Sequence, residues 1–161
     1  MNSNLNFTLA AENLGKFLYK NHSQIATAES CTGGWVAQCI TDIAGSSAWF
    51  DRGFITYSNA SKVDMLNVDH NTLEEFGAVS AEVAEQMLCG ALKNSQADYA
   101  LAITGIAGPS GGSIAKPVGT VYIGWQKKGQ AAIVILKQFS GNRDEVRRQA
   151  VYKALNIIPS E

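Results

Sequence analysis

Cysteine and histidine are scarce in this sequence of 161 residues, and their positions exclude several kinds of site. Cys31, Cys39 and Cys89 are odd in number and show no C-x-x-C or Cys/His spacing, which argues against a metal site and a disulfide framework. His22 and His70 lie away from the polar segments described below, so a Ser/His/Asp or Cys/His/Asn site has no evident base. We therefore expect a reduced protein with no metal and no structural disulfide.

Charge and long apolar runs are also in short supply. Charged residues make up 17% of the chain and the formal net charge is -1, so there is no overall basic footprint for nucleic acid or an acidic membrane. The N-terminal stretch "MNSNLNFTLAAENLG" has no basic start and no continuous apolar run, and no other stretch approaches a membrane span. We expect a cytoplasmic protein that binds neither nucleic acid nor membrane.

The chain does have a hydrophobic content of 46%, enough to bury a core in one domain spanning residues 1–161. Apolar residues at helical spacing alternate with short strands of buried character. Helices are expected at 7–21, 32–45, 59–66, 70–76, 80–95 and 142–157, and strands at 24–30, 52–58, 98–105 and, as a hairpin, 118–126 and 131–139. This order predicts an α/β fold, a three-layer α/β/α sandwich with a mixed, mostly parallel sheet.

Polar or glycine-rich sequence follows three of the predicted strands. The segments are "ESCTGG" at 29–34, "TYSNASK" at 56–62 and "TGIAGPSGG" at 104–112. Because ligands bind beyond the carboxyl ends of the strands in open α/β sheets, we expect the three segments to line one pocket. The third lacks the GK[ST] ending of a P-loop and is expected to close over a ligand, with Thr104 as a polar contact.

The first segment places two nucleophile types side by side, Ser30 and Cys31. Gly33 and Gly34 let the backbone turn sharply, and the helix that follows directs free N–H groups toward the turn. Such a turn favours an anion or a developing oxyanion, and it lowers the pKa of a nearby thiol. The sequence also fits a plain strand-to-helix turn with Thr32 as N-cap. From these residues alone, the identity of the nucleophile stays open.

The second segment carries Tyr57 at the end of a predicted strand and Lys62 in about the first turn of the next helix. Ser58 or Asn59 can cap that helix. A cation there opposes the helix dipole, and partial burial would lower the pKa of Lys62 further, so a neutral Lys62 is a candidate general base. With a serine it can activate a hydroxyl, and Tyr57 can relay or donate a proton. The alternative is that Lys62 is a solvated surface residue.

The last predicted helix begins with the same electrostatic conflict. Arg143 falls at its first position, and Arg147 lies one turn later on the same face. An anionic ligand at the helix start would resolve the conflict, since departures from local rules are frequent at functional sites. A surface salt-bridge pattern with Asp144 and Glu145 is the competing interpretation.

Five segments together resemble the CinA C-terminal domain family: "TAESCTGG", "GFITYSNASK", "AITGIAGPSGG", "KPVGTVYIG" and "FSGNRDEVRRQAV". They run in order along nearly the whole chain, and five ordered motifs are far more specific than any one alone. Single-domain members of this family include amidohydrolases of pyridine nucleotide salvage. The resemblance therefore implies hydrolysis of the carboxamide of nicotinamide mononucleotide to nicotinic acid mononucleotide and ammonia. It also implies no metal and no organic cofactor, and it supports the α/β/α fold.

Carried to the matching positions, the resemblance implies catalytic residues Ser30, Tyr57 and Lys62, with Thr104 and Arg143 in the substrate site. We expect Ser30 to attack the amide carbon while Lys62 takes its proton. Tyr57 would assist proton transfer to the leaving ammonia. Adjacent residues of an extended segment point opposite ways, so Cys31 is expected to be a small packing residue.

Two further roles follow from the chemistry of the residues. Backbone N–H groups of Thr32, Gly33 and Gly34 would hold the oxyanion, and Arg143 would bind the 5′-phosphate by charge-assisted hydrogen bonds. Two rival functions stay open, a non-catalytic nucleotide-binding module and an amidohydrolase that acts on a different amide. The aromatic residues of "AWFDRGF" at 48–54 leave a homodimer open as well.

Overall fold

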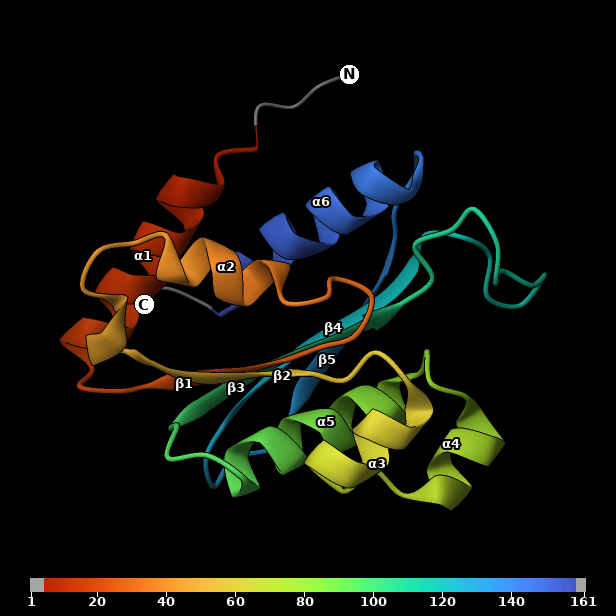
Figure 1. Ribbon diagram of the computed structural model, residues 1–161, viewed down its shortest axis with the longest axis horizontal. Helices are drawn as coiled ribbons and strands as arrows, with labels where there is room; N and C mark the ends of the chain where they lie inside the picture. Colours follow the sequence, from red (N-terminus) through yellow and green to blue (C-terminus); the bar gives the residue numbers. More distant parts are fainter. Residues whose placement is uncertain (1–4, 159–161) are drawn as a thin grey trace.

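The computed structural model describes residues 5–158, in which helices cover both faces of a five-stranded sheet (Figure 1). The strands are β1 (Ile25–Glu29), β2 (Phe50–Ile55), β3 (Tyr99–Gly105), β4 (Thr120–Lys127) and β5 (Ile133–Gln138). The helices are α1 (Phe7–Lys20), α2 (Trp35–Thr41), α3 (Asn59–Leu66), α4 (His70–Phe76), α5 (Ala81–Lys93) and α6 (Arg143–Leu155), with a short 3₁₀ helix at Ser46–Ala48.

The strand order across the sheet is β2-β1-β3-β4-β5. Strand β1 runs parallel to both β2 and β3, whereas β4 runs antiparallel to β3 and to β5. Among the strands of the described residues, β4 alone therefore points the opposite way. The carboxyl ends of β1, β2 and β3 meet at one edge, which is the edge where the sequence predicts a pocket.

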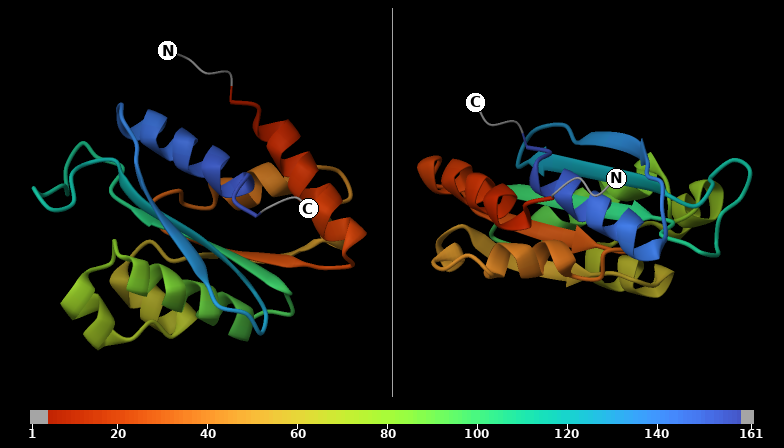
Figure 2. Two further views of the ribbon diagram at one scale, coloured as in Figure 1. Left: turned by 180° about the vertical axis from the view of Figure 1, so that it is seen from behind. Right: turned by 90° about the horizontal axis from the view of Figure 1, so that it is seen from above.

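The layers follow the predicted sandwich. Helices α1, α2 and α6 cover one face of the sheet, and α3, α4 and α5 cover the other (Figures 1 and 2). All five residues of β1 are buried, as expected for a strand packed on both sides. One hydrophobic cluster joins α1, α2 and α6 to the sheet, and a second joins α3 and α5 to its other face. The predicted α/β/α fold is confirmed.

Several predicted element boundaries differ from the structure, and those of α2 and β2 bear on the site. Helix α2 begins at Trp35, with Gly34 rather than Thr32 at its N-cap, because Gly33 and Gly34 both adopt positive φ and delay the helix. The helix also ends at Thr41, and Gly45 precedes the 3₁₀ helix instead. Strand β2 ends at Ile55 because its partner β1 stops at Glu29, so Tyr57 lies beyond the strand.

Capping side chains place the two helices that reach the pocket. Ser58 and Asn142 each form a complete capping box, at the starts of α3 and α6 respectively. The aromatic residues of 48–54 are partly accounted for by the core, since Trp49 is buried, Phe50 packs against the same cluster and Phe54 packs against the second. No helix within residues 5–158 has both the length and the apolar character needed to span a membrane.

Candidate active site

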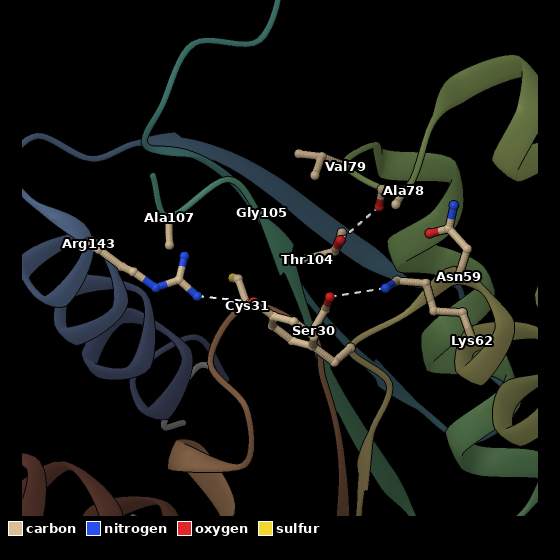
Figure 3. A pocket seen from close by; sticks show the side chains of 11 residues that line it. Ser30, Cys31, Asn59, Lys62, Ala78, Val79, Thr104, Gly105, Ala107 and Arg143 are labelled. Carbon is tan, nitrogen blue, oxygen red and sulfur yellow. Dashed lines mark hydrogen bonds between the residues drawn. The ribbon is translucent and has the colours of Figure 1, made fainter. Parts of the chain in front are cut away.

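A pocket of about 290 Å³ lies at the carboxyl ends of β1, β2 and β3 (Figure 3). All three segments expected to converge contribute to it. Its lining consists of Ser30 and Cys31 after β1, Tyr57, Asn59 and Lys62 after β2, Thr104, Gly105 and Ala107 around the end of β3, Ala78 and Val79 between α4 and α5, and Arg143 at the start of α6. Segments distant in sequence thus form one concave site.

Ser30 and Lys62 point toward each other across this pocket (Figure 3). The Nζ atom of Lys62 lies 3.0 Å from Oγ of Ser30 and donates a second hydrogen bond of 2.8 Å to the carbonyl oxygen of Thr56. The lysine side chain comes from the first turns of α3, where the Ser58 cap sets the start of the helix. The arrangement joins a hydroxyl to an amine at hydrogen-bond distance.

Burial of Lys62 disfavours the protonated form of its amine. The residue is only 1% exposed, and no carboxylate in the described part of the chain forms an ion pair with it. Burial lowers the pKa of Lys62 below its ordinary value, an effect only partly opposed by Cys31. The interpretation of Lys62 as a solvated surface residue is therefore wrong. A neutral amine keeps one lone pair, which can accept the proton of a hydroxyl.

Cys31 lies next to Ser30 but packs in a different environment. It lines the pocket with part of its surface and otherwise belongs to the hydrophobic cluster under α2 and α6. Burial raises the pKa of its thiol to about 12, so the reactive thiolate is disfavoured near neutral pH. Of the two adjacent nucleophile types, Ser30 is the one whose side chain forms a hydrogen bond with the amine of Lys62.

Tyr57 and Arg143 lie together at the outer part of the pocket. Arg143 donates one hydrogen bond of 3.1 Å to the hydroxyl of Tyr57 and another of 2.8 Å to the carbonyl of Gly108. Tyr57 is 63% exposed, in contrast to the buried Ser30 and Lys62. The pocket therefore has a buried end, formed by Ser30 and Lys62, and an open end that carries the guanidinium of Arg143. Thr104 lines it as well, and its hydroxyl donates to the carbonyl of Ala78 at 2.7 Å.

The turn after β1 is arranged differently from the sequence prediction. Thr32, Gly33 and Gly34 do not line the pocket. The carboxylate of Glu29 accepts hydrogen bonds from the Thr32 hydroxyl and from the backbone N–H groups of Gly34, Val36 and Ala37. The N–H of Gly33 is bonded to the carbonyl of Ser30. The predicted oxyanion donors at Gly33 and Gly34 are therefore already occupied by the protein itself.

Two charged residues that hold this turn were not identified correctly from the sequence. Glu29 lies within the strand predicted at 24–30, and nothing in the local pattern indicates that its carboxylate binds the N–H groups at the start of α2. Arg147 was expected to face an anion beside Arg143, but its guanidinium binds the backbone carbonyls of Cys31 and Thr32. Ala78 and Val79 also went unnoticed, because small apolar residues in a loop carry no chemical signal.

Within residues 5–158, no three His, Cys, Asp or Glu side chains gather closely enough to hold a metal ion.

A family model described as the CinA C-terminal domain matches residues 8–161. The chain belongs to the CinA C-terminal domain family. The family resemblance of the five sequence motifs is thereby confirmed.

Similar proteins in this family share most of their length with the chain. It is 53% identical over 148 residues to the nicotinamide-nucleotide amidohydrolase PncC of Escherichia coli strain K12, covering 92% of this chain and 90% of that protein. The protein of the same name from Pseudomonas putida is 49% identical, with 92% of each chain covered. A solved structure of the competence/damage inducible protein CihA from Agrobacterium tumefaciens has a TM-score of 0.91 at 43% identity, covering 94% of this chain and 92% of that one.

Proposed function

We propose that this protein is an amidohydrolase that converts nicotinamide mononucleotide to nicotinic acid mononucleotide and ammonia, with Ser30 as nucleophile and Lys62 as base. The observation that carries the proposal is the 3.0 Å contact between Ser30 Oγ and Lys62 Nζ inside a pocket. The substrate class is taken from the relatives named nicotinamide-nucleotide amidohydrolase, which are about half identical in sequence to this chain.

The reaction begins with neutral Lys62. As Oγ of Ser30 forms a bond to the carboxamide carbon, Lys62 takes the hydroxyl proton and becomes an ammonium ion. The C–N bond then breaks, and the proton held by Lys62 passes to the departing nitrogen so that ammonia leaves. Water next attacks the acyl-enzyme and gives its proton to Lys62, which returns it to Ser30 as the acid is released. One lysine therefore serves as base and acid in turn.

The outer part of the pocket would hold the rest of the nucleotide. Arg143 supplies a guanidinium, which suits the geometry and charge of a phosphate group. Tyr57 accepts a hydrogen bond from Arg143 at 3.1 Å, so the two side chains are already coupled. We place the 5′-phosphate at Arg143 and propose that Tyr57, which lines the same pocket, assists the proton transfer from Lys62 to the leaving ammonia.

The purified protein is expected to release ammonia from nicotinamide mononucleotide much faster than from nicotinamide riboside, which lacks the phosphate. Arg143→Ala should lower kcat/KM for the nucleotide by about 10- to 100-fold, the effect of losing charge-assisted hydrogen bonds. The same substitution should change the riboside rate far less. A folded wild type that releases no ammonia from the nucleotide would instead favour a nucleotide-binding module or hydrolysis of a different amide.

Activity should depend on pH through Lys62. Because burial lowers the pKa of Lys62 below the ordinary 10.5, kcat/KM should rise along an acid limb whose midpoint lies below that value and then level off. Initial rates across the pH range measure this limb. The riboside is the control, because it has no phosphate group, whose second pKa is about 6. An acid limb that is also seen with the riboside therefore belongs to the enzyme and not to the substrate. A rate still rising in proportion to hydroxide at pH 10.5 would contradict a depressed lysine pKa.

A further inference from the structure

Asn59 lines the pocket, and the mechanism described above gives it no role. It is the first residue of α3 and directly follows Ser58, whose side chain caps the helix. Because Ser58 supplies the cap, the amide of Asn59 is not used for that purpose. Asn59 is also exposed, in contrast to the buried Lys62, so a molecule that enters the pocket can reach its side chain.

The amide of Asn59 differs from the other polar groups of the pocket in having no protein partner. The remaining oxygen- and nitrogen-bearing side chains of the lining, each with a hydrogen-bond partner in the protein, are Ser30, Tyr57, Lys62, Thr104 and Arg143. The side chain of Asn59 forms no hydrogen bond within residues 5–158. A primary amide carries both an acceptor oxygen and two N–H donors, so both kinds of contact are open to a ligand.

Helix geometry places Asn59 beside the amine of Lys62. Residues three apart on an α-helix lie on the same face, with about 5–6 Å between their Cβ atoms. Because Cα–Cβ bonds tilt toward the N-terminus of a helix, the side chain of Lys62 extends toward the turn that begins with Asn59. Figure 3 shows both side chains on one wall of the pocket and Arg143 on the opposite wall. A group bound next to Lys62 Nζ therefore lies on the same side of the pocket as the Asn59 amide.

The proposed reaction puts the nitrogen of the substrate carboxamide on this wall. Lys62 first takes the proton of Ser30 and then gives it to the departing nitrogen, so that nitrogen has to lie within reach of Nζ. The carbon under attack lies at Ser30 Oγ, which is 3.0 Å from the same Nζ atom. Asn59 is the other polar side chain of α3 in the lining. Its carbonyl oxygen can accept an N–H of the leaving group.

We propose that Asn59 is a specificity-determining residue whose side-chain oxygen accepts a hydrogen bond from the nitrogen of the substrate carboxamide. The contact favours a primary amide over an ester, which has no N–H to donate. As the nitrogen gains a proton from Lys62, it becomes a stronger donor, so the hydrogen bond strengthens toward the transition state. The inference rests on the proposed function, since it assigns a contact to the leaving group of that reaction.

The test compares Asn59→Leu with Asn71→Leu as its matched control. Asn71 is an exposed asparagine near the start of α4 that does not line the pocket, and its side chain also has no partner among the described residues. The two substrates are nicotinamide mononucleotide and the methyl ester of nicotinic acid mononucleotide. Both give nicotinic acid mononucleotide, so one chromatographic assay measures both rates.

Asn59→Leu should lower the ratio of kcat/KM for the amide to kcat/KM for the ester by about 3- to 10-fold, the effect of losing one hydrogen bond. Asn71→Leu should leave this ratio at the wild-type value. General structural damage would slow both substrates by the same factor, and an unchanged ratio in Asn59→Leu would overturn the inference. If the Leu variant does not fold, Asn59→Ala decides the question by the same ratio.

Binding measurements keep the test independent of turnover. They use Ser30→Ala, which lacks the proposed nucleophile, and calorimetric titration with the amide and ester nucleotides. Adding Asn59→Leu should weaken binding of the amide by about 3-fold or more relative to the ester. If the wild type releases no ammonia, the proposed function fails, but this shift in binding would still support recognition of the carboxamide by Asn59. An unchanged ratio of the two Kd values, or no binding of either nucleotide, would overturn it.

Discussion

Replacing Ser30 with alanine should lower kcat for ammonia release from nicotinamide mononucleotide by about 10⁴- to 10⁶-fold, as removal of a nucleophile from a catalytic unit does. The hydroxyl is the group that lies 3.0 Å from Lys62 Nζ, and alanine leaves that amine with no hydroxyl to deprotonate. Steady-state assays with a coupled ammonia readout measure the loss. Circular dichroism and thermal melting establish that the variant is folded.

The matched control is the neighbouring residue. Cys31→Ala removes a thiol whose pKa burial raises to about 12, so it should retain kcat within a few-fold and lose only modest stability. Mass spectrometry after rapid quench should detect an acyl adduct on the wild type that is absent from Ser30→Ala. Full activity in Ser30→Ala, or loss of activity in a folded Cys31→Ala, would remove Ser30 from the role of nucleophile.

Replacing Lys62 with methionine should have two effects of opposite sign. Ammonia release should fall by at least about 10³-fold, because the base and the nucleophile act as a unit. The free energy of unfolding should rise, because methionine keeps an unbranched side chain of similar size and does not require an amine to be desolvated. Activity and unfolding by denaturant, measured on one preparation, give both quantities.

The sign of the pH dependence follows from the direction of the pKa shift. The pKa of Lys62 is lowered on folding, so the unfolded chain binds more protons between the folded pKa and the ordinary 10.5. The free energy of unfolding of the wild type should therefore rise with pH across that window. The advantage of Lys62→Met over the wild type should be largest below the folded pKa and shrink as pH approaches 10.5. The exposed Lys128 is the control, and Lys128→Met should show no such trend.

Much of the fold could be predicted because its elements have strong periodic signals. The buried strand at 25–29 and the amphipathic helix at 7–20 are set by local hydrophobic patterns, which sequence analysis detects directly. The candidate site was accessible for a different reason. Ser30, Tyr57, Lys62, Thr104 and Arg143 all follow or flank strand ends or helix starts, and the topology of an α/β sheet brings such positions together.

The parts that sequence analysis missed depend on long-range contacts. Arg147 and Cys31 are separated by 116 positions, and no local pattern indicates that a side chain of α6 will bind a carbonyl beside the nucleophile. The capping role of Glu29 was missed because its partners include backbone N–H groups. Every residue except proline supplies such a group, so the sequence carries no signal of the contact. The glycines were correctly associated with a sharp turn, but the acceptors of their N–H groups are the Ser30 carbonyl for Gly33 and the Glu29 carboxylate for Gly34.

The two layers of helices contribute different chemistry to one pocket. Lys62 comes from α3 on one face of the sheet, Arg143 comes from α6 on the other, and Ser30 lies between them at the end of β1 (Figures 1 and 3). The residues proposed to break the amide bond and the residue proposed to recognise the nucleotide are thus carried by separate scaffolds. Substitutions along the first turn of α6 can alter which molecule is accepted while the serine and lysine stay in register. Substrate preference can therefore evolve through changes in α6 while the residues proposed to catalyse the reaction stay the same.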